Sequence, residues 1–170
     1  RFSRYLTVFE RRIPYREMDQ MPTDGLAPDI LLVGLGRFGA SVATNLAKRQ
    51  CRFIAVDFDP EAVRLHAKDG YTVRYGDVEN PEFIASLPLE NIKWVVSTIR
   101  DSQINRMLLT GLRQQGYQGK TAFAVTSRHD QTRFDKEGVN IVLEPYADAA
   151  KEAVEKLFAE HTSAPTGQSS

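Results

Sequence analysis

The sequence lacks what several classes of protein require. Its 170 residues include a single cysteine, Cys51, which excludes an internal disulfide and fits a reducing compartment. The three histidines are scattered (His66, His129 and His161), so no metal site is expected. Basic and acidic residues number 22 each, which argues against a nucleic-acid binder. With no secretory signal and no apolar run near the ~20 residues of a membrane span, we expect a soluble cytoplasmic module.

The sequence does contain a regular alternation of short apolar runs and amphipathic stretches. The expected strands cover residues 30–33, 53–56, 71–75, 94–99, 121–126 and 139–143. Helices are expected between them, and a last one from about residue 146 to residue 161. This alternation predicts an α/β fold, namely a Rossmann-like doubly wound sheet of six parallel strands in the order 3-2-1-4-5-6 with helices on both faces.

The two ends of the chain differ from this pattern and suggest three regions. Residues 1–28 form a basic amphipathic lead-in and linker, residues 29–161 the nucleotide-binding domain, and residues 162–170 a small polar tail that we expect to be disordered. The lead-in carries five arginines and one glutamate within its first 16 residues. Such a segment could pack on the domain with its arginines solvated, or it could follow a transmembrane helix on the cytoplasmic side.

A glycine-rich sequence, Gly34-Leu35-Gly36-Arg37-Phe38-Gly39, lies between the first expected strand and the first expected helix. In that context it predicts a dinucleotide phosphate loop. Gly34 permits the tight turn, Gly36 lets the backbone approach a pyrophosphate, and Gly39 lets the helix pack closely on the sheet. The helix N-terminus would attract phosphates, and Arg37 could add a charged hydrogen bond. The alternative is a glycine turn without a ligand.

A carboxylate ends the second expected strand. Asp57 comes 18 residues after Gly39 (57 minus 39), close to the ~20-residue spacing of a ribose-binding acid. A carboxylate accepts from both ribose hydroxyls and repels a 2′-phosphate, which favours NAD or an adenine nucleotide over NADP. Asp59 is expected to cap the helix that begins at Pro60.

Polar residues also follow the third and fourth expected strands. Asp77, directly after Gly76, could accept from an adenine amino group or cap the next helix as a turn residue. Thr98 and Arg100 end the fourth strand, where its loop should reach the ligand crevice. Arg100 could bind a phosphate or a small anionic effector, or it could pair with Asp101 at the surface.

The sequence offers no catalytic apparatus. The nucleotide-binding pattern uses residues 29 to about 144, and the Tyr-x-x-x-Lys pair of short-chain dehydrogenases, a nucleophile elbow and a Walker loop are all missing. We therefore expect a protein that senses a nucleotide and is not an enzyme. Two alternatives remain, the cofactor-binding half of a small NAD-dependent oxidoreductase and a dimer scaffold that has lost its ligand.

In combination these motifs resemble the RCK (regulator of potassium conductance) domain, also called TrkA-N. The segments that carry the resemblance are residues 34–39, residues 56–60, Gly76-Asp77-Val78 and Asn105. The Gly-Arg-Phe-Gly stretch and the basic lead-in are most similar to cytosolic domains of Kef-type monovalent cation/proton antiporters. Departures are Ile99-Arg100-Asp101, where the family often has a small residue and Gly-Asp, and the lack of a second lobe.

The resemblance implies a regulatory domain on the cytoplasmic face of the inner (plasma) membrane, attached to or associated with a potassium channel or cation/proton antiporter. It implies binding of NAD(H) or of AMP, ADP or ATP, and a homodimer through the Rossmann domain, whose last helix would match the dimer-forming helix of the family. Phosphates would bind the glycine loop, a ribose Asp57, and the adenine Asp77 with Val78. The predicted cofactor-binding residues are Gly34, Gly36, Arg37, Phe38, Gly39, Asp57, Phe58, Asp77, Val78, Thr98 and Arg100.

Overall fold

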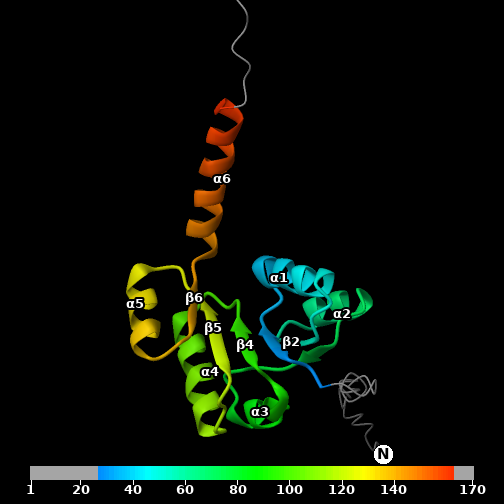
Figure 1. Ribbon diagram of the computed structural model, residues 1–170. Coiled ribbons are helices and arrows are strands. Elements are labelled where there is room, and N and C mark those ends of the chain that lie inside the picture. The colour runs from blue at the N-terminus through cyan, green and yellow to red at the C-terminus, as the bar shows by residue number, and fades with distance from the viewer. Residues whose placement is uncertain (1–26, 163–170) are drawn as a thin grey trace, which may run out of the picture.

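The computed structural model describes residues 27–162 and shows one sheet of six parallel strands with helices on both faces (Figure 1). The strands are β1 (Ile30–Val33), β2 (Phe53–Asp57), β3 (Val73–Tyr75), β4 (Trp94–Ser97), β5 (Lys120–Ala124) and β6 (Ile141–Leu143). Their order in the sheet is β3-β2-β1-β4-β5-β6. The predicted fold class and strand order are therefore confirmed.

The helices divide between the two faces of the sheet. They are α1 (Arg37–Lys48), α2 (Pro60–Lys68), α3 (Pro81–Ala85), α4 (Ser102–Gln114), α5 (Arg128–Lys136) and α6 (Pro145–Thr162). Helices α1 and α2 cover one face, and α3, α4 and α5 cover the other (Figure 1). The strand order reverses between β1 and β4, which is where ligands bind in sheets of this kind.

Two apolar clusters hold these layers together. Alternate residues of a strand point to opposite faces, so Leu31 and Val33 join the cluster under α4, whereas Leu32 joins the cluster under α1. All three side chains are at most 1% exposed. Because both faces are covered, the central strands are apolar throughout. The ends of β1 and β4 are thereby held in a rigid core.

Most of the helices begin with a side-chain cap. Asp59, Asn80, Asp101 and Ser127 each accept a hydrogen bond from a backbone N–H in the first turn of α2, α3, α4 and α5, respectively. The predicted cap at Asp59 is confirmed. Helix α1 differs, because Gly36 occupies its cap position and provides no side-chain hydrogen bond.

Some element boundaries differ from the sequence-based expectations. The fourth strand was expected to reach Ile99 but ends at Ser97, because Thr98 turns its hydroxyl to the carbonyls of Val33 and Gly34. The sixth strand begins at Ile141, since Val139 packs in the core before pairing starts. The predicted lead-in and tail lie outside the described residues, apart from residues 27–28 and residue 162.

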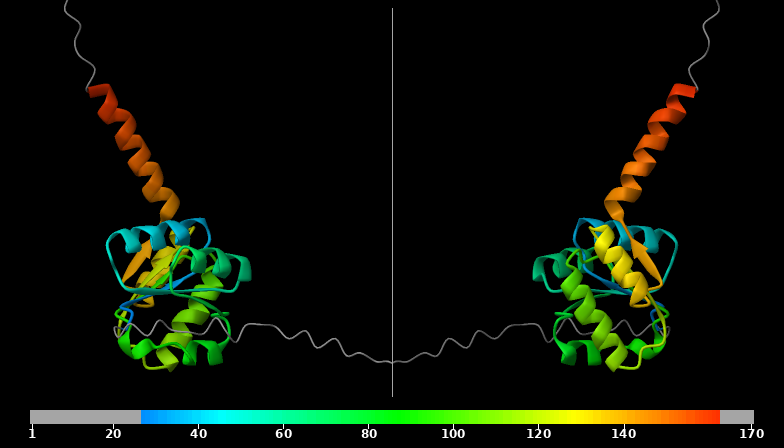
Figure 2. Two further views of the ribbon diagram at one scale, coloured as in Figure 1. Left: turned by 90° about the vertical axis from the view of Figure 1, so that its right-hand side faces the viewer. Right: turned by 90° about the vertical axis from the view of Figure 1, so that its left-hand side faces the viewer.

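Helix α6 runs away from the body of the domain (Figures 1 and 2). Val154 and Leu157 are 51% and 66% exposed, although both are apolar. With Ala150 they recur at spacings of four and three residues, which places them along one side of the helix. Within the described part of the chain, no helix has the length and apolar character needed to cross a membrane.

Candidate functional site

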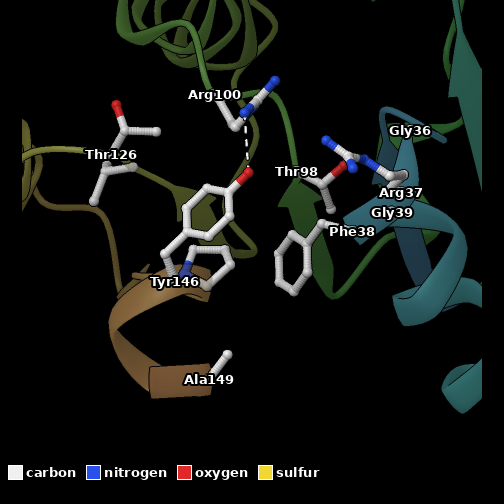
Figure 3. A pocket seen from close by; sticks show the side chains of 11 residues that line it. Gly36, Arg37, Phe38, Gly39, Thr98, Arg100, Thr126, Tyr146 and Ala149 are labelled. Carbon is white, nitrogen blue, oxygen red and sulfur yellow. Dashed lines mark hydrogen bonds between the residues drawn. The ribbon is translucent and has the colours of Figure 1, made fainter. Parts of the chain in front are cut away.

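A pocket of about 430 Å³ lies where the strand order reverses, at the carboxyl ends of β1, β4 and β5 (Figure 3). Its volume is in the range of small-molecule sites. One wall is the glycine loop with the start of α1, and the opposite wall is the start of α6. The lining residues are Gly36, Arg37, Phe38, Gly39, Thr98, Arg100, Val125, Thr126, Pro145, Tyr146 and Ala149.

The glycine loop has little space for side chains except at its middle position. Gly34 adopts a φ of 91°, which side-chain-bearing residues rarely adopt. A Cβ atom on Gly39 would lie 1.9 Å from the carbonyl oxygen of Gly34, so α1 packs directly against the end of β1. A Cβ atom on Gly36 would meet nothing within 4 Å. The open space at Gly36 faces the pocket, where a phosphate would have to approach.

The N-terminus of α1 forms part of the pocket wall. Its first turn contains no acidic residue, and its cap residue Gly36 makes no side-chain hydrogen bond. The first N–H groups of a helix need acceptors from outside the helix, and the helix dipole places partial positive charge there. This helix start is therefore suited to an anion, and Arg37 within it adds a full positive charge.

Thr98 bonds the end of β4 to the glycine loop, and Asn105 fixes the backbone on both sides of Thr98. The Thr98 hydroxyl donates to the carbonyl oxygen of Gly34 at 2.9 Å. The fully buried Asn105 accepts from the Ser97 hydroxyl at 2.6 Å and donates to the carbonyl oxygen of Ile99 at 2.8 Å. Buried and satisfied bonds of this kind rigidify a site. Thr98 consequently has a fixed place in the pocket floor.

The carboxylate of Asp57 is bonded to the glycine loop. One oxygen accepts from the backbone N–H of Leu35 at 2.5 Å, and the other accepts from the backbone N–H of Asp59 at 2.8 Å. The residue is 9% exposed. From the end of β2, the Asp57 side chain thus stabilises the turn of the glycine loop. A carboxylate has about four lone-pair sites, so two remain for ligand hydroxyls.

Four of the predicted cofactor-binding residues lie outside this pocket on the β2 and β3 side of the loop. Asp57 is one of them, and Phe58 beside it is exposed. Asp77 accepts from the backbone N–H of Glu79 at 2.8 Å, as a turn residue does. Val78 is buried in the core. Their roles toward ribose and adenine stay predictions, as does that of Gly34, which shapes the loop without lining the pocket.

Arg37 and Arg100 bring two guanidinium groups to the pocket. Among the residues that the structure describes, neither forms an ion pair with a carboxylate. Asp101, the partner considered for Arg100, instead caps α4 by accepting from Gln103 and Ile104. Arg100 donates to the hydroxyl of Tyr146 at 3.1 Å (Figure 3). Two cations without acidic partners favour an anionic ligand.

Sequence reasoning missed the far wall of the pocket, which Val125, Thr126, Pro145, Tyr146 and Ala149 form. Two of these residues follow β5 and three lie in the first turns of α6. A signal was available, since the carboxyl ends of all strands near the reversal point should border the crevice. Tyr146, directly after Pro145, belongs to no sequence motif, so it is assigned only to the start of the last helix and not to a binding site.

Ser127 fixes the segment that follows Thr126 in this wall. Its hydroxyl donates to the Asp130 carboxylate at 2.7 Å and accepts from the Asp130 backbone N–H at 3.1 Å. The hydrogen bond from Ser127 lowers the pKa of Asp130 below its ordinary value. Helix α5 therefore begins at a fixed point beside the pocket, and the acid of its first turn remains charged at neutral pH.

Solved structures of other proteins share the fold that holds this pocket. The TrkA-N domain of the inner membrane protein ybaL from Escherichia coli is similar, with a TM-score of 0.69 and 20% identity over 78% of this chain and 98% of that one. The structure of the GsuK channel bound to NAD has a TM-score of 0.63 and 21% identity, over 79% of this chain and 24% of that one. The Shewanella denitrificans Kef CTD in its AMP-bound form has a TM-score of 0.63 and 18% identity, over 76% of this chain and 79% of that one.

These three likenesses, at such low identities, show a shared fold. The family is shown by a separate match, because the model of the TrkA-N domain covers residues 30–145, from the first residue of β1 to the first residue of α6. That range includes the glycine loop, Asp57 and Arg100. The chain belongs to the TrkA-N (RCK) domain family, as the resemblance of its motifs predicted.

Proposed function

We propose that this protein is a nucleotide-sensing regulatory domain of a potassium channel or monovalent cation/proton antiporter, acting on the cytoplasmic face of the membrane. The observation that carries the proposal is the uncapped start of α1, which faces a pocket with two guanidinium groups that have no acidic partner among residues 27–162. The family membership supports the regulatory role. The basic lead-in of residues 1–28 would connect the domain to the membrane part.

The ligand proposed is NAD(H) or an adenine nucleotide such as AMP, ADP or ATP. The related GsuK channel binds NAD and the related Kef CTD binds AMP. In this chain the open backbone at Gly36 and the charge of Arg37 would hold phosphate oxygens. Asp57, at the end of β2, would take the ribose hydroxyls with its remaining lone pairs. The residues present therefore fit a nucleotide.

A sensing role is favoured over catalysis by the chemistry of the pocket wall. Among the described residues that line it, the titratable side chains are two arginines and Tyr146. The lining contains no carboxylate, imidazole or thiol that would transfer a proton at neutral pH. The pocket thus has groups for binding an anion, and we infer that occupancy itself is the signal.

Nucleotide binding is tested by thermal unfolding of the full chain with NAD+, NADH, NADP+, AMP, ADP and ATP. A ligand at ~100 times its Kd stabilises by about 2.7 kcal/mol. We expect such stabilisation with NAD(H) or an adenine nucleotide and none with NADP+. If no nucleotide shifts the unfolding temperature, the chain is not a nucleotide sensor and the scaffold hypothesis takes its place.

Replacing Asp57 with asparagine should lower the preference for NAD+ over NADP+ about 10-fold, because one charged hydrogen bond to ribose is lost and repulsion of a 2′-phosphate ends. The ratio of the two Kd values from calorimetry is the measurement, since a general weakening of the loop affects both ligands alike. Asp59→Asn is the matched control, because asparagine is an equally good cap. An unchanged ratio in Asp57→Asn would exclude Asp57 from the ribose site.

We also propose that the protein is a homodimer in which α6 packs against a second copy. The exposed apolar side of this helix would be covered in that arrangement, and burying a leucine stabilises by roughly 1.5–3 kcal/mol. The helix stands clear of the body of its own domain (Figure 2). A partner helix can therefore reach it without rearrangement of the Rossmann core.

Replacing Leu157 with aspartate should raise the dimer dissociation constant at least 100-fold, because a charge would enter the apolar contact. Sedimentation velocity measures the change from dimer to monomer. The unfolding of the core should stay the same, since Leu157 is 66% exposed in the single chain. Lys151→Asp places an acid on another side of α6 and should leave the dimer intact; equal dissociation of both variants would argue against this interface.

A further inference from the structure

The hydrogen bond between Arg100 and Tyr146 joins two elements on opposite sides of the pocket. Arg100 follows β4, whereas Tyr146 is the second residue of α6. The guanidinium donates to the tyrosine hydroxyl at 3.1 Å, and both side chains line the pocket (Figure 3). This contact connects the binding site directly to the base of the helix that leaves the domain.

Tyr146 is a weak partner for a guanidinium. Its hydroxyl is neutral and accepts a single hydrogen bond from Arg100. The guanidinium is charged in both cases, but a phosphate adds a negative charge on the acceptor and can accept two parallel bonds from one arginine, which a tyrosine hydroxyl cannot do. A phosphate that binds the guanidinium in this bidentate geometry through Nη1 would therefore compete with the Tyr146 hydroxyl for Arg100.

The sheet order indicates which phosphate reaches Arg100. Strand β1 and its glycine loop lie between β2, which ends in Asp57, and β4, which leads to Arg100. A nucleotide with its ribose at Asp57 and its first phosphate at Gly36 would extend any further group toward Arg100. In that placement AMP would end at the glycine loop, whereas the second phosphate of ADP or of a dinucleotide would lie nearer to Arg100.

We propose that Tyr146 competes with the second phosphate of a bound nucleotide for Arg100, and that a diphosphate ligand thereby releases the base of α6. The proposal rests on the nucleotide-binding function proposed above. Tyr146 is then a positioning residue that acts through Arg100. Ligand binding to Arg100 and loss of the Arg100–Tyr146 hydrogen bond are thermodynamically coupled. A ligand that binds Arg100 therefore favours the state in which the base of α6 is released, and AMP favours that state much less.

The test compares the Kd values of ADP and AMP for the full chain and for Tyr146→Phe. Phenylalanine keeps the ring and removes the hydroxyl that holds Arg100. We expect the preference for ADP over AMP to rise about 3- to 10-fold. Arg100→Gln should lower that preference about 10-fold, and adding Tyr146→Phe to Arg100→Gln should change nothing further. Tyr117→Phe is the matched control, because the Tyr117 hydroxyl donates to the carbonyl oxygen of Lys120 at the amino end of β5, away from the pocket.

Hydrogen exchange gives a second measurement, at the backbone amides of residues 146–150. Exchange there should speed up on ADP binding in the unchanged chain, and it should already be fast without ligand in Tyr146→Phe. If Tyr146→Phe weakens ADP binding, or raises the preference equally in the Arg100→Gln background, Tyr146 does not compete for Arg100. Failure of both AMP and ADP to bind the unchanged chain would instead overturn the nucleotide-binding function itself.

Discussion

Replacing Gly39 with alanine is expected to destabilise the folded domain by about 3 kcal/mol or more, a large part of the 5–15 kcal/mol of a typical domain. The new Cβ atom would lie 1.9 Å from the carbonyl oxygen of Gly34 and 2.7 Å from the Thr98 hydroxyl. The Gly34 oxygen belongs to the backbone of a rigid turn and cannot rotate away. Helix α1 would have to move off β1, and the glycine-loop wall of the pocket would move with it.

Thermal and urea unfolding measure this effect, and at this chain length a loss of 3 kcal/mol lowers the Tm by about 10 °C. Nucleotide-induced stabilisation should vanish together with the packing. The control for the Tm in the absence of nucleotide is the same change at Gly36, three residues earlier in the same loop, where an added Cβ atom would meet nothing within 4 Å. A Gly39→Ala variant with an unchanged Tm would mean that α1 does not pack against β1 as closely as the structure shows.

Replacing Gly36 with alanine is expected to leave the fold intact and to weaken nucleotide binding about 100-fold or more. The backbone at Gly36 has φ −61° and ψ −174°, which alanine adopts readily, and its Cβ atom would meet no atom within 4 Å. Alanine is a poorer helix cap than glycine, so a cost below about 1 kcal/mol is expected. The methyl group would occupy the point where a phosphate must approach the helix N-terminus.

Calorimetric titration with AMP or NAD+ measures the loss, which corresponds to two charge-assisted hydrogen bonds of about 1.5 kcal/mol each. Adenosine, which has no phosphate, should lose little affinity in the same variant. The two ligands together separate a blocked phosphate site from a general defect. Undiminished binding of AMP by Gly36→Ala would show that phosphates are held elsewhere.

The architecture could be predicted from the sequence because its signals are local and repeated. Apolar runs such as residues 30–33 and 53–56 alternate with helical patterns, and a parallel sheet with right-handed crossovers then allows few arrangements. The phosphate loop was equally visible, since glycines at positions 34, 36 and 39 each meet a backbone requirement of the turn. In the strands, the helices and the glycine loop, the local backbone geometry requires particular residue types, so those residue types in turn predict the geometry.

The far wall of the pocket could not be predicted in the same way. Arg100 and Tyr146 are 46 residues apart, and their contact depends on where α6 starts relative to the end of β4. Asp57 shows a related difficulty, because the spacing that identifies a ribose acid does not reveal that both of its oxygens already bond the backbone. The position of α6 relative to β4, and the choice of hydrogen-bond partner by Asp57, produce no periodic pattern in the sequence from which they could be predicted.

The length of α6 has a mechanical consequence. At 1.5 Å per residue its 18 residues span about 27 Å, and only its first turns lie in the pocket wall. A tilt of roughly 10° about Pro145 would therefore move the far end by about 5 Å, although the helix backbone beside the pocket would shift by only about 1 Å or less. Such a lever converts the displacement of a single side chain into a movement of the size of a helical turn.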